Sequence, residues 1–387
     1  MNLFRNLSAA AWLVMPLAFF GCSKNAPPLP PQPMPPVTAI STGSSHSLFI
    51  TADGALWGMG STCHGELGNL DQDGRHTPVR IIASGVIAMS AGNGYSLFLK
   101  GDGSMWGMGE NHGRLGDGTK VDRFSPVCIV AGGVSSISAG YDHSLFLKDD
   151  GSLWGMGWNY IGQLGDGTHT NRPSPICIVS SGVIAISAGN GHSLFLKQDG
   201  SLWGMGLNLS GELGDGSQTN RLTPVRIVAS EVTAIHAGVF NSLFVKIDGS
   251  LWGMGWNESG ELGDGTKRKS LTPDTLTPKQ IVANSVISVT GGPQFSLFLK
   301  SNGSLWGMGR NSNGELGDGT KSEQLIPVCT VSSDVTTIAA GGTIGGNSLF
   351  IKKDGSLWGM GYNGGALGDG TYSRSIVPIQ ITTPVQK

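Results

Sequence analysis

The sequence has few charged residues of either sign. Asp, Glu, Lys and Arg make up 13% of its 387 residues, against an average of roughly 25% in soluble domains. The formal net charge is −2, so the chain lacks a basic field that would attract nucleic acid, and we expect no nucleic-acid partner. Glycine is abundant instead, with 62 residues, about twice the usual share of roughly 7%. This composition favours a fold with many tight turns and closely packed backbones.

Cysteine is also scarce. The five cysteines include no Cys-x-x-Cys pair, so we do not expect a zinc site. Cys128, Cys177 and Cys329 occupy one position of a repeat that is described below. Equivalent positions of separate repeats lie too far apart for the roughly 4.4–6.8 Å Cα separation that a disulfide needs. We therefore predict free thiols at these positions and at Cys63, although the N-terminus is typical of an exported protein.

The sequence also lacks a recognisable catalytic constellation. No unique combination of Ser, His and Asp and no phosphate-binding loop stands out. Carboxylates recur in the motifs GELG and GDG, but turn chemistry explains an Asp-Gly pair without any catalytic role. Residues 68–74 superficially resemble a calcium loop, yet Arg80 stands where the bidentate Glu would be. We predict no enzymatic activity, no cofactor and no metal.

The N-terminus predicts export. One cation, Arg5, precedes an apolar run that ends at Phe20; this run is shorter than the roughly 20 residues that cross a bilayer and has the length of a secretory signal. Gly21 and Cys22 follow, and this arrangement resembles the bacterial lipoprotein signal, although Phe19 and Phe20 depart from its usual residues. We predict a signal peptide of lipoprotein type over residues 1–21 and a lipid anchor in a membrane of the cell envelope through acylated Cys22. An ordinary signal peptide, which would make the protein secreted, is the alternative.

Residues 22–36 are predicted to be a proline-rich tether. Seven prolines fall between Asn25 and Pro36. Proline fixes φ and disfavours helix in the residue before it, so the segment should be an extended polyproline II helix. At about 3.1 Å per residue, it could hold a folded domain roughly 35–40 Å from a membrane.

The remainder, residues 37–387, is a tandem repeat. The core of the run from His192 to Gly206, HSLFLKQDGSLWGMG, recurs with its tryptophan at intervals of 49, 48, 49, 49, 54 and 52 residues. The repeated tryptophans are Trp57, Trp106, Trp154, Trp203, Trp252, Trp306 and Trp358. Such a period indicates stacked or circular units rather than independent domains.

Each repeat predicts four short strands, with sequences like VTAIS, HSLFLK, SLWGMG and PVRIV. An Asp-Gly or Asn-Gly pair separates the second and third strands and predicts a hairpin with a two-residue type I′ turn, in which both central residues have φ > 0. These pairs begin at Asp53, Asp102, Asp150, Asp199, Asp248, Asn302 and Asp354.

The strand pattern predicts how the repeats pack. Trp252 and Met254 lie on one face of their strand, and Leu251, Gly253 and Gly255 lie on the other. Trp and Met could therefore nest against a neighbour's flat glycine face, and both faces of HSLFLK are apolar enough to be covered. We predict an all-β, seven-bladed β-propeller, which closes on itself to protect its edges. A linear solenoid is the alternative, but solenoids need polar end caps, and the first and last repeats resemble the middle ones.

The pattern AG-xx-HSLFLK-x-DG-SLWGMG-x-N-xx-GELGDG resembles the repeat of the regulator of chromosome condensation family, whose members form seven-bladed propellers. The resemblance covers residues 37–387. Met takes the place of a tryptophan that is usual in the family, and the histidine is present only as His46, His143 and His192. A ring of seven catalytic histidines is therefore excluded.

In an antiparallel meander, the loops after the first and third strands leave one face of the ring. These loops are the variable parts of the repeat, and variable loops on a rigid scaffold are the usual binding surface. Aromatic residues and Arg are enriched at binding hot spots. The candidate partner-binding residues on this face are Glu110, His112, Tyr141, Asp142, Trp158, Tyr160, Phe240, Trp256, Arg310 and Tyr362. Packing between neighbouring loops is the alternative role for each of them.

Three functions are compatible with these observations. The leading hypothesis is a non-catalytic, membrane-anchored propeller, expected to be monomeric, that binds a protein, peptide or glycan partner outside the cytoplasm. The family resemblance implies an alternative, nucleotide exchange on a small GTPase. However, the founding member uses a protruding hairpin and a basic tail, and the largest insertion here adds about five residues, in the segment KRKSLTPDTL. A propeller-based hydrolase or lyase is the third hypothesis, since the fold itself does not set the function.

Overall fold

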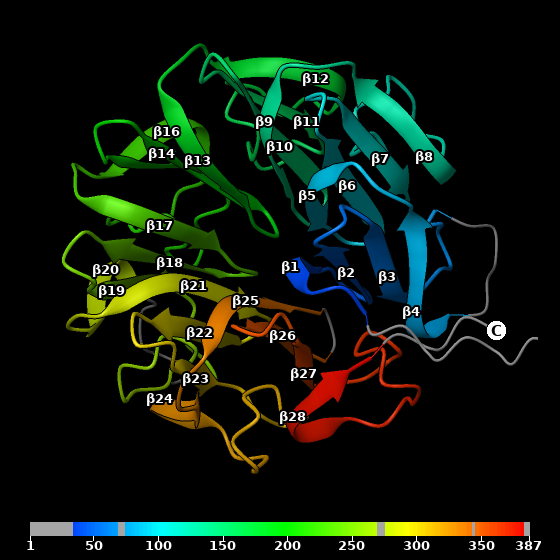
Figure 1. Cartoon of the computed structure of the whole chain (residues 1–387). Helices are drawn as coiled ribbons and strands as arrows, with labels where there is room; N and C mark the ends of the chain where they lie inside the picture. Colours follow the sequence, from blue (N-terminus) through cyan, green and yellow to red (C-terminus); the bar gives the residue numbers. More distant parts are fainter. Residues whose placement is uncertain (1–33, 69–73, 269–274, 343–344, 383–387) are drawn as a thin grey trace, which may run out of the picture. The chain divides into compact units, whose positions relative to one another are not determined.

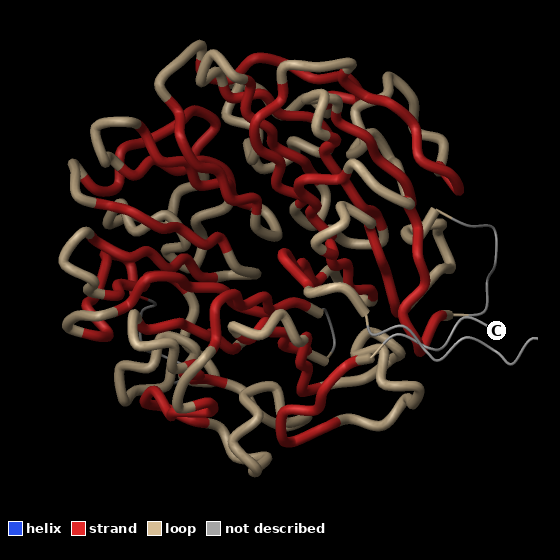
Figure 2. The backbone as a smooth tube through the Cα atoms, in the orientation of Figure 1, coloured by secondary structure: helices blue, strands red, loops and turns tan. Residues whose placement is uncertain are grey.

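Each repeat forms one four-stranded antiparallel sheet (Figures 1 and 2). The computed structural model describes residues 34–68, 74–268, 275–342 and 345–382, all within the unit Met34–Pro384. The predicted signal peptide, Cys22 and most of the tether lie outside these residues. Within the described ranges the chain forms strands and loops, and no helix there has the length and apolarity to cross a membrane.

The four predicted strands are present in every repeat. The first strands are β1 (Val37–Thr42), β5 (Val86–Ala91), β9 (Val134–Ala139), β13 (Val183–Ala188), β17 (Val232–Ala237), β21 (Val286–Gly292) and β25 (Val335–Gly341). The second strands are β2 (His46–Thr51), β6 (Tyr95–Lys100), β10 (His143–Lys148), β14 (His192–Lys197), β18 (Asn241–Lys246), β22 (Phe295–Lys300) and β26 (Asn347–Lys352). The third strands are β3 (Leu56–Gly60), β7 (Met105–Gly109), β11 (Leu153–Gly157), β15 (Leu202–Gly206), β19 (Leu251–Gly255), β23 (Leu305–Gly309) and β27 (Leu357–Gly361). The fourth strands are β4 (Arg75–Ile82), β8 (Arg123–Val130), β12 (Arg172–Val179), β16 (Arg221–Val228), β20 (Thr275–Val282), β24 (Gln324–Val331) and β28 (Ser375–Ile381).

The seven sheets, hereafter blades 1 to 7, are arranged radially with their first strands innermost (Figure 1). Strand β1 packs against β5 of the next blade and also against β25 and β26 of the last one. The chain is therefore a closed seven-bladed propeller, as predicted, and the linear solenoid is excluded. Each blade consists of four consecutive strands, so the ring closes by packing and by hydrogen bonds, without a blade shared between the two ends of the chain. Gly342 N–H, for example, donates to Gly43 O at 2.9 Å.

The hairpin between the second and third strands is present, but the predicted type I′ turn is wrong. In blade 2, Gly103 has φ +78° and its N–H donates to Lys100 O at 2.9 Å, whereas Asp102 is not among the non-glycine residues with positive φ. The hairpin is therefore a three-residue loop of type I with a glycine bulge. Asp102 Oδ1 accepts bonds from both the N–H (2.9 Å) and the Oγ (2.6 Å) of Ser104. The Asp is needed as a turn cap rather than for a left-handed backbone.

The hydrophobic core lies between the blades. Phe98 and Met108 of blade 2 pack against Leu48 and Leu56 of blade 1, with Trp106 at the edge of this cluster. The prediction that Trp and Met share one face and point toward a neighbour is confirmed. The prediction that Trp and Met pack against the glycine face of a neighbouring third strand is wrong, because leucines of the same blade cover those glycines.

The methionine meets a different glycine. Gly116, in the GRLG loop of blade 2, has φ +78°, and a Cβ placed there would lie 2.7 Å from Met156 Sδ of blade 3. This glycine of the GELG-type motif therefore supplies both the left-handed turn and the room for the methionine.

The tryptophan fixes its own blade. Trp106 stacks on Phe98 with ring centroids 6.3 Å apart, and Lys100 Nζ lies over the indole, 4.1 Å from its ring centroid. The indole N–H donates to Ser104 Oγ at 2.8 Å, and Ser104 in turn is held by Asp102. The repeated DG-SLW sequence is therefore a structural unit that joins turn, strand and aromatic stack.

Candidate functional site

All ten candidate residues lie on one face of the propeller, which we call the variable face. The loops after the first and third strands leave the same side only if the GELGDGT segment between the third and fourth strands contains no strand. Within the described residues it contains none. The loops after the first and third strands therefore leave the same side of every blade. The structure places the ten candidates in these loops; it does not bring them into one cluster.

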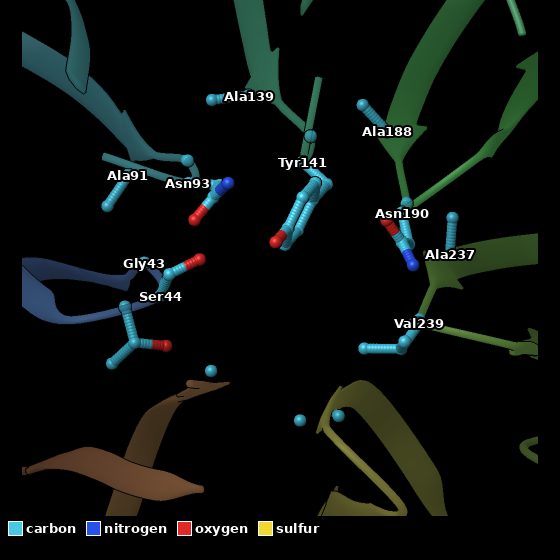
Figure 3. A pocket seen from close by; sticks show the side chains of 18 of the residues that line it. Gly43, Ser44, Ala91, Asn93, Ala139, Tyr141, Ala188, Asn190, Ala237 and Val239 are labelled. Carbon is cyan, nitrogen blue, oxygen red and sulfur yellow. The ribbon is translucent and has the colours of Figure 1, made fainter. Parts of the chain in front are cut away.

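A shallow cavity of about 150 Å³ lies at the centre of this face, where the seven loops after the first strands converge (Figure 3). The side chains of Tyr141, Asn93 and Asn190 surround it. Glycine is required at the rim, since a Cβ on Gly140 would lie 2.6 Å from Gly189 O of the next blade. The repeated AG pair thus permits seven strand ends to meet.

Five of the candidate aromatics, together with Leu209, form what we call the aromatic strip on blades 3, 4 and 5. Trp158 and Tyr160 contact each other edge to face, with centroids 5.4 Å apart, and Tyr160 is 60% exposed. Phe240 and Trp256 lie 6.0 Å apart in a tilted arrangement, and the Arg268 guanidinium lies 4.2 Å from the Trp256 ring. The strip consists of Tyr141, Trp158, Tyr160, Leu209, Phe240 and Trp256, each at least partly exposed.

Glu110, His112 and Asp142 belong to a charged network that is organised by Arg114. The Arg114 side chain is only 4% exposed and donates to Asp142 Oδ1 at 2.7 Å, to Asn93 O at 2.7 Å and to Glu110 Oε2 at 3.3 Å. His112 Nε2 lies 2.9 Å from Glu110 Oε1. Burial raises the pKa of Asp142, and the Arg114 charge opposes that rise. This network joins blades 2 and 3 and leaves His112 as its exposed member.

Arg310 and Tyr362 lie apart from both groups. Arg310 Nε donates to Ser312 Oγ at 2.9 Å and lies 3.6 Å from Oε1 of the buried Glu315. Tyr362 is 47% exposed and borders a second cavity, between blades 7 and 1. Loop packing is therefore the main role that the structure gives Arg310.

The repeated carboxylates serve the turns. In blade 2, Asp117 Oδ1 accepts bonds from Asn111 Nδ2 (2.8 Å) and Thr119 N–H (2.9 Å), and Oδ2 accepts one from Arg123 Nε (2.6 Å). Burial alone would raise the pKa of Asp117, but these hydrogen bonds outweigh it and hold the pKa below its usual value. Across the described ranges, no group of three or more His, Cys, Asp or Glu side chains is placed to hold a metal ion. The calcium-like segment falls largely on residues 69–73, which the structure does not describe.

The histidines of the repeat are buried and form hydrogen bonds between neighbouring blades. His46 Nε2 lies 2.9 Å from Ser96 Oγ of the next blade, and Ser96 Oγ donates back to Glu66 O at 2.7 Å. His143 repeats this contact with Ser193 at 2.8 Å. Burial lowers the pKa of both histidines to about 4, so they are neutral at physiological pH. Tyr95 makes the equivalent contact, with its hydroxyl 2.9 Å from Ser144 Oγ.

The sequence analysis missed several exposed or central residues. Arg114 was overlooked because GRLG resembles a variant of the GELG motif. The sequence does mark it, because among the seven repeats only this one has a cation at that position. Leu209, 59% exposed, was passed over as an aliphatic residue in a polar loop. On the opposite face, Ile87 (61%), Ile184 (54%) and Ile287 (55%) are also exposed. Exposed apolar side chains are therefore not confined to the variable face.

The four cysteines outside the signal region are Cys63, Cys128, Cys177 and Cys329, and all of them are free and exposed. Cys128 and Cys177 lie on the outer strands β8 and β12. The prediction of free thiols is consistent with this placement.

Comparison with known protein families matches the chain to a family described as the RCC1-like domain, over residues 21–297 and 131–387. Among curated proteins, the chain is similar to the mitochondrial RCC1 domain-containing protein RUG3 of Arabidopsis thaliana, with 34% identity over 106 residues. That alignment covers 26% of this chain and 23% of the plant protein, so the chain matches about a quarter of the length of this relative.

Two solved structures share the fold. Human WBSCR16 superposes with a TM-score of 0.72 and 21% identity, covering 82% of this chain and 88% of the human one. Prp20p from Saccharomyces cerevisiae, a protein studied for its binding to Gsp1p and histones, superposes with a TM-score of 0.69 and 22% identity, covering 79% and 80% of the two chains. At these identities the likeness concerns the fold alone.

Proposed function

The chain belongs to the RCC1-like domain family, and on this premise we propose that it is a non-catalytic binding scaffold whose aromatic strip engages a protein, peptide or glycan partner. The carrying observation is the exposure of the strip on three successive blades. Tyr160 is 60% exposed, Leu209 59% and Phe240 40%. Large apolar side chains in loops on a rigid scaffold are typical of binding hot spots.

The packing of the strip supports this proposal. Trp158 and Tyr160 contact each other, as do Phe240 and Trp256, so the rings are held in place before any partner arrives. Rings fixed in this way lose little conformational freedom on binding, which favours affinity. Arg268 over Trp256 adds a cation beside the apolar surface.

A non-catalytic role is supported by the use that the fold makes of its polar groups. The recurring carboxylates cap turns, as Asp117 does, and the buried histidines bridge blades, as His46 does. A general acid or base must come within hydrogen-bond reach of the reacting substrate atom, and His46 is fully buried.

We further propose that the propeller acts in the cell envelope, anchored through an acylated Cys22. The proposal depends on the apolar run that ends at Gly21-Cys22 and on the proline-rich segment that follows.

Affinity capture with the tagged full-length protein tests the binding proposal. The variant with Trp158→Ala, Tyr160→Ala and Trp256→Ala is expected to capture at most one tenth of the amount of partner that the unmodified protein captures. A matched variant of the opposite face, with Ile87→Ala, Ile184→Ala and Ile287→Ala, is expected to capture the same amount as the unmodified protein. Loss in the isoleucine variant with retention in the aromatic variant would transfer the binding site to the opposite face.

A further inference from the structure

The ring-closing interface between blades 7 and 1 contains a cavity of about 210 Å³. It opens on the variable face, away from the aromatic strip. Its lining includes Ser44, Ser45, Gly345, Asn347, Tyr362 and Ala366. A buried water needs only about 10–15 Å³ on such a measure, so the cavity has room for a group much larger than one water.

A small side chain at one repeat position accompanies the cavity. Ala366 occupies the second position of the G-x-L-G motif, and the other six blades have a long polar side chain there. All six are at least 96% buried: Glu66, Arg114, Gln163, Glu212, Glu261 and Glu315. Each ends in a planar carboxylate, carboxamide or guanidinium group. Blade 7 presents a methyl group at this position and leaves the space open.

Blade 2 shows what fills the equivalent space. Its loop Asn111-His112-Gly113-Arg114 has the same length as Asn363-Gly364-Gly365-Ala366 of blade 7, one residue shorter than the loop in blade 3. The Arg114 guanidinium fills the site and donates to Glu110, Asp142 and Asn93 O.

The charges of Glu110, Arg114 and Asp142, between blades 2 and 3, are absent from the equivalent site between blades 7 and 1. By repeat position, Tyr362 replaces Glu110, Ser45 replaces Asp142, and Ala366 replaces Arg114. The cation and both anions have therefore been exchanged together for uncharged residues.

This exchange determines the charge of a suitable ligand. None of the described residues that line the cavity carries a formal charge, so a buried guanidinium or carboxylate would lose its hydration without gaining a counterion from them. A neutral planar group of similar size is favoured.

Four equivalent interfaces hold a carboxyl group, and one holds the neutral carboxamide of Gln163. Burying the carboxylate form is unfavourable at such an interface, because burial raises the pKa of Glu261 to about 7. Gln163 of blade 3 is 3% exposed, and its carboxamide oxygen accepts a bond from Ile161 N–H at 3.1 Å. A carboxamide offers two N–H donors and one acceptor. The hydroxyls of Ser44 and Ser45 and the Asn347 amide offer matching partners in the empty site.

We propose that the cavity between blades 7 and 1 is a binding site for a carboxamide side chain, a glutamine or asparagine of a protein or peptide, with Tyr362 packing against the alkyl stem at the entrance. Tyr362 is 47% exposed, and its ring can cover an apolar stem while its hydroxyl stays in water. The site needs no residue of the aromatic strip, so it is independent of the function proposed above.

Saturation-transfer NMR on the purified full-length protein tests the proposal. The probes are Nα-acetyl-glutamine N-methylamide and the corresponding glutamate and arginine derivatives at pH 7. The glutamine probe is expected to give at least five times the signal of the other two. Equal signals from all three probes, or no signal from any, would overturn the proposal and leave a cavity that holds only water.

Three variants test where the probe binds. Ala366→Gln fills the cavity from within, as Gln163 does in blade 3, and is expected to reduce the glutamine signal at least fivefold, while Ala366→Ser keeps it within twofold. An undiminished signal in folded Ala366→Gln contradicts the proposed site. The double variant Ser45→Asp, Tyr362→Glu introduces the equivalents of Asp142 and Glu110 without placing a side chain at position 366. It is expected to reverse the preference toward the arginine probe by at least fivefold, and an unchanged preference would likewise overturn the proposal.

Discussion

The carboxamide of Asn347 in blade 7 donates to Ser47 Oγ in blade 1 at 3.3 Å, although the two residues are 300 positions apart. The same pair of repeat positions links His46 to Ser96 between blades 1 and 2. The interface between blades 7 and 1 therefore has the same side-chain hydrogen bond as the interface between blades 1 and 2, with Asn in the place of His. This identity of contacts explains how a ring of separate four-stranded blades closes without exchanging strands.

Removing Ser47 Oγ, the acceptor of the Asn347 hydrogen bond, should lower the free energy of unfolding. Ser47 is fully buried and Asn347 is 3% exposed, so Ser47→Ala leaves a buried donor without its partner. The expected loss is about 1–3 kcal/mol in the free energy of unfolding, measured by urea denaturation. If Ser47→Ala with Asn347→Leu loses as much as Ser47→Ala alone, or more, the unpaired amide is not the cause.

Stability should fall on acidification through the buried histidines. Burial lowers the pKa of His143 to about 4, from an ordinary value of 6.5. Between these two values the unfolded chain binds a proton that the folded chain does not, so the stability contribution is complete above pH 6.5 and is lost as the pH falls. Each buried histidine with a pKa of about 4 should lower the free energy of unfolding by about 2 kcal/mol as the pH falls from 6.5 to 5.

The variant His143→Asn, which copies Asn241 of blade 5, tests this pH dependence. Its unfolding free energy should decrease by about 2 kcal/mol less than that of the unmodified protein over the same range. The comparison also removes the opposite effect of Glu261, whose pKa burial raises to about 7, because that carboxyl is common to both proteins. Parallel pH profiles for the two proteins would contradict the assignment.

Gly116 should tolerate no side chain. Gly116→Ala places a methyl group 2.7 Å from Met156 Sδ at a φ of +78°, and we expect a loss of about 2–3 kcal/mol. Gly132→Ala is the control, because its nearest neighbour would lie 3.7 Å away and its φ is not positive. Thermal unfolding should show a large decrease in Tm for the first variant and little change for the second; equal effects would refute the packing argument.

Arg114 should be the most sensitive member of the charged network. Arg114→Ala leaves Glu110 and Asp142 together without their cation, at an expected cost of about 2–3 kcal/mol after allowance for their partial exposure. The triple variant Arg114→Ala, Glu110→Gln, Asp142→Asn should recover at least half of this loss. Chemical denaturation measures both, and an absence of recovery would mean that Arg114 acts through packing alone.

Acylation of Cys22 has a direct test in cell fractionation. Cys22→Ser is expected to move the protein from the membrane fraction to the soluble envelope fraction and to change its electrophoretic mobility. Unchanged fractionation and mobility would remove the lipid anchor from the proposal. A cytoplasmic location of the unmodified protein would instead favour the exchange-factor hypothesis.

The sequence by itself was sufficient for the architecture. The period marked by Trp57 and its six equivalents predicted seven blades, and the alternation in LWGMG predicted which side chains enter the core. Both signals are local, because successive side chains of a strand point to opposite faces and the sequence alone shows which residues share a face. The variable face could also be predicted, because the direction of each loop depends only on the number of strands before it.

The tertiary structure decided what depends on partners distant in the chain or on fine backbone geometry. Asp-Gly fits two turn types, and only the backbone shows that Asp102 lacks positive φ. Arg114 and Asp142 are 28 residues apart in sequence, and their pairing requires neighbouring blades. The cavity beside Ala366 likewise needs the last blade to meet the first. Contacts between blades join positions of different repeats, so the repeat pattern predicts that an interface exists, but the few residues that break the pattern acquire a meaning only once the ring is closed.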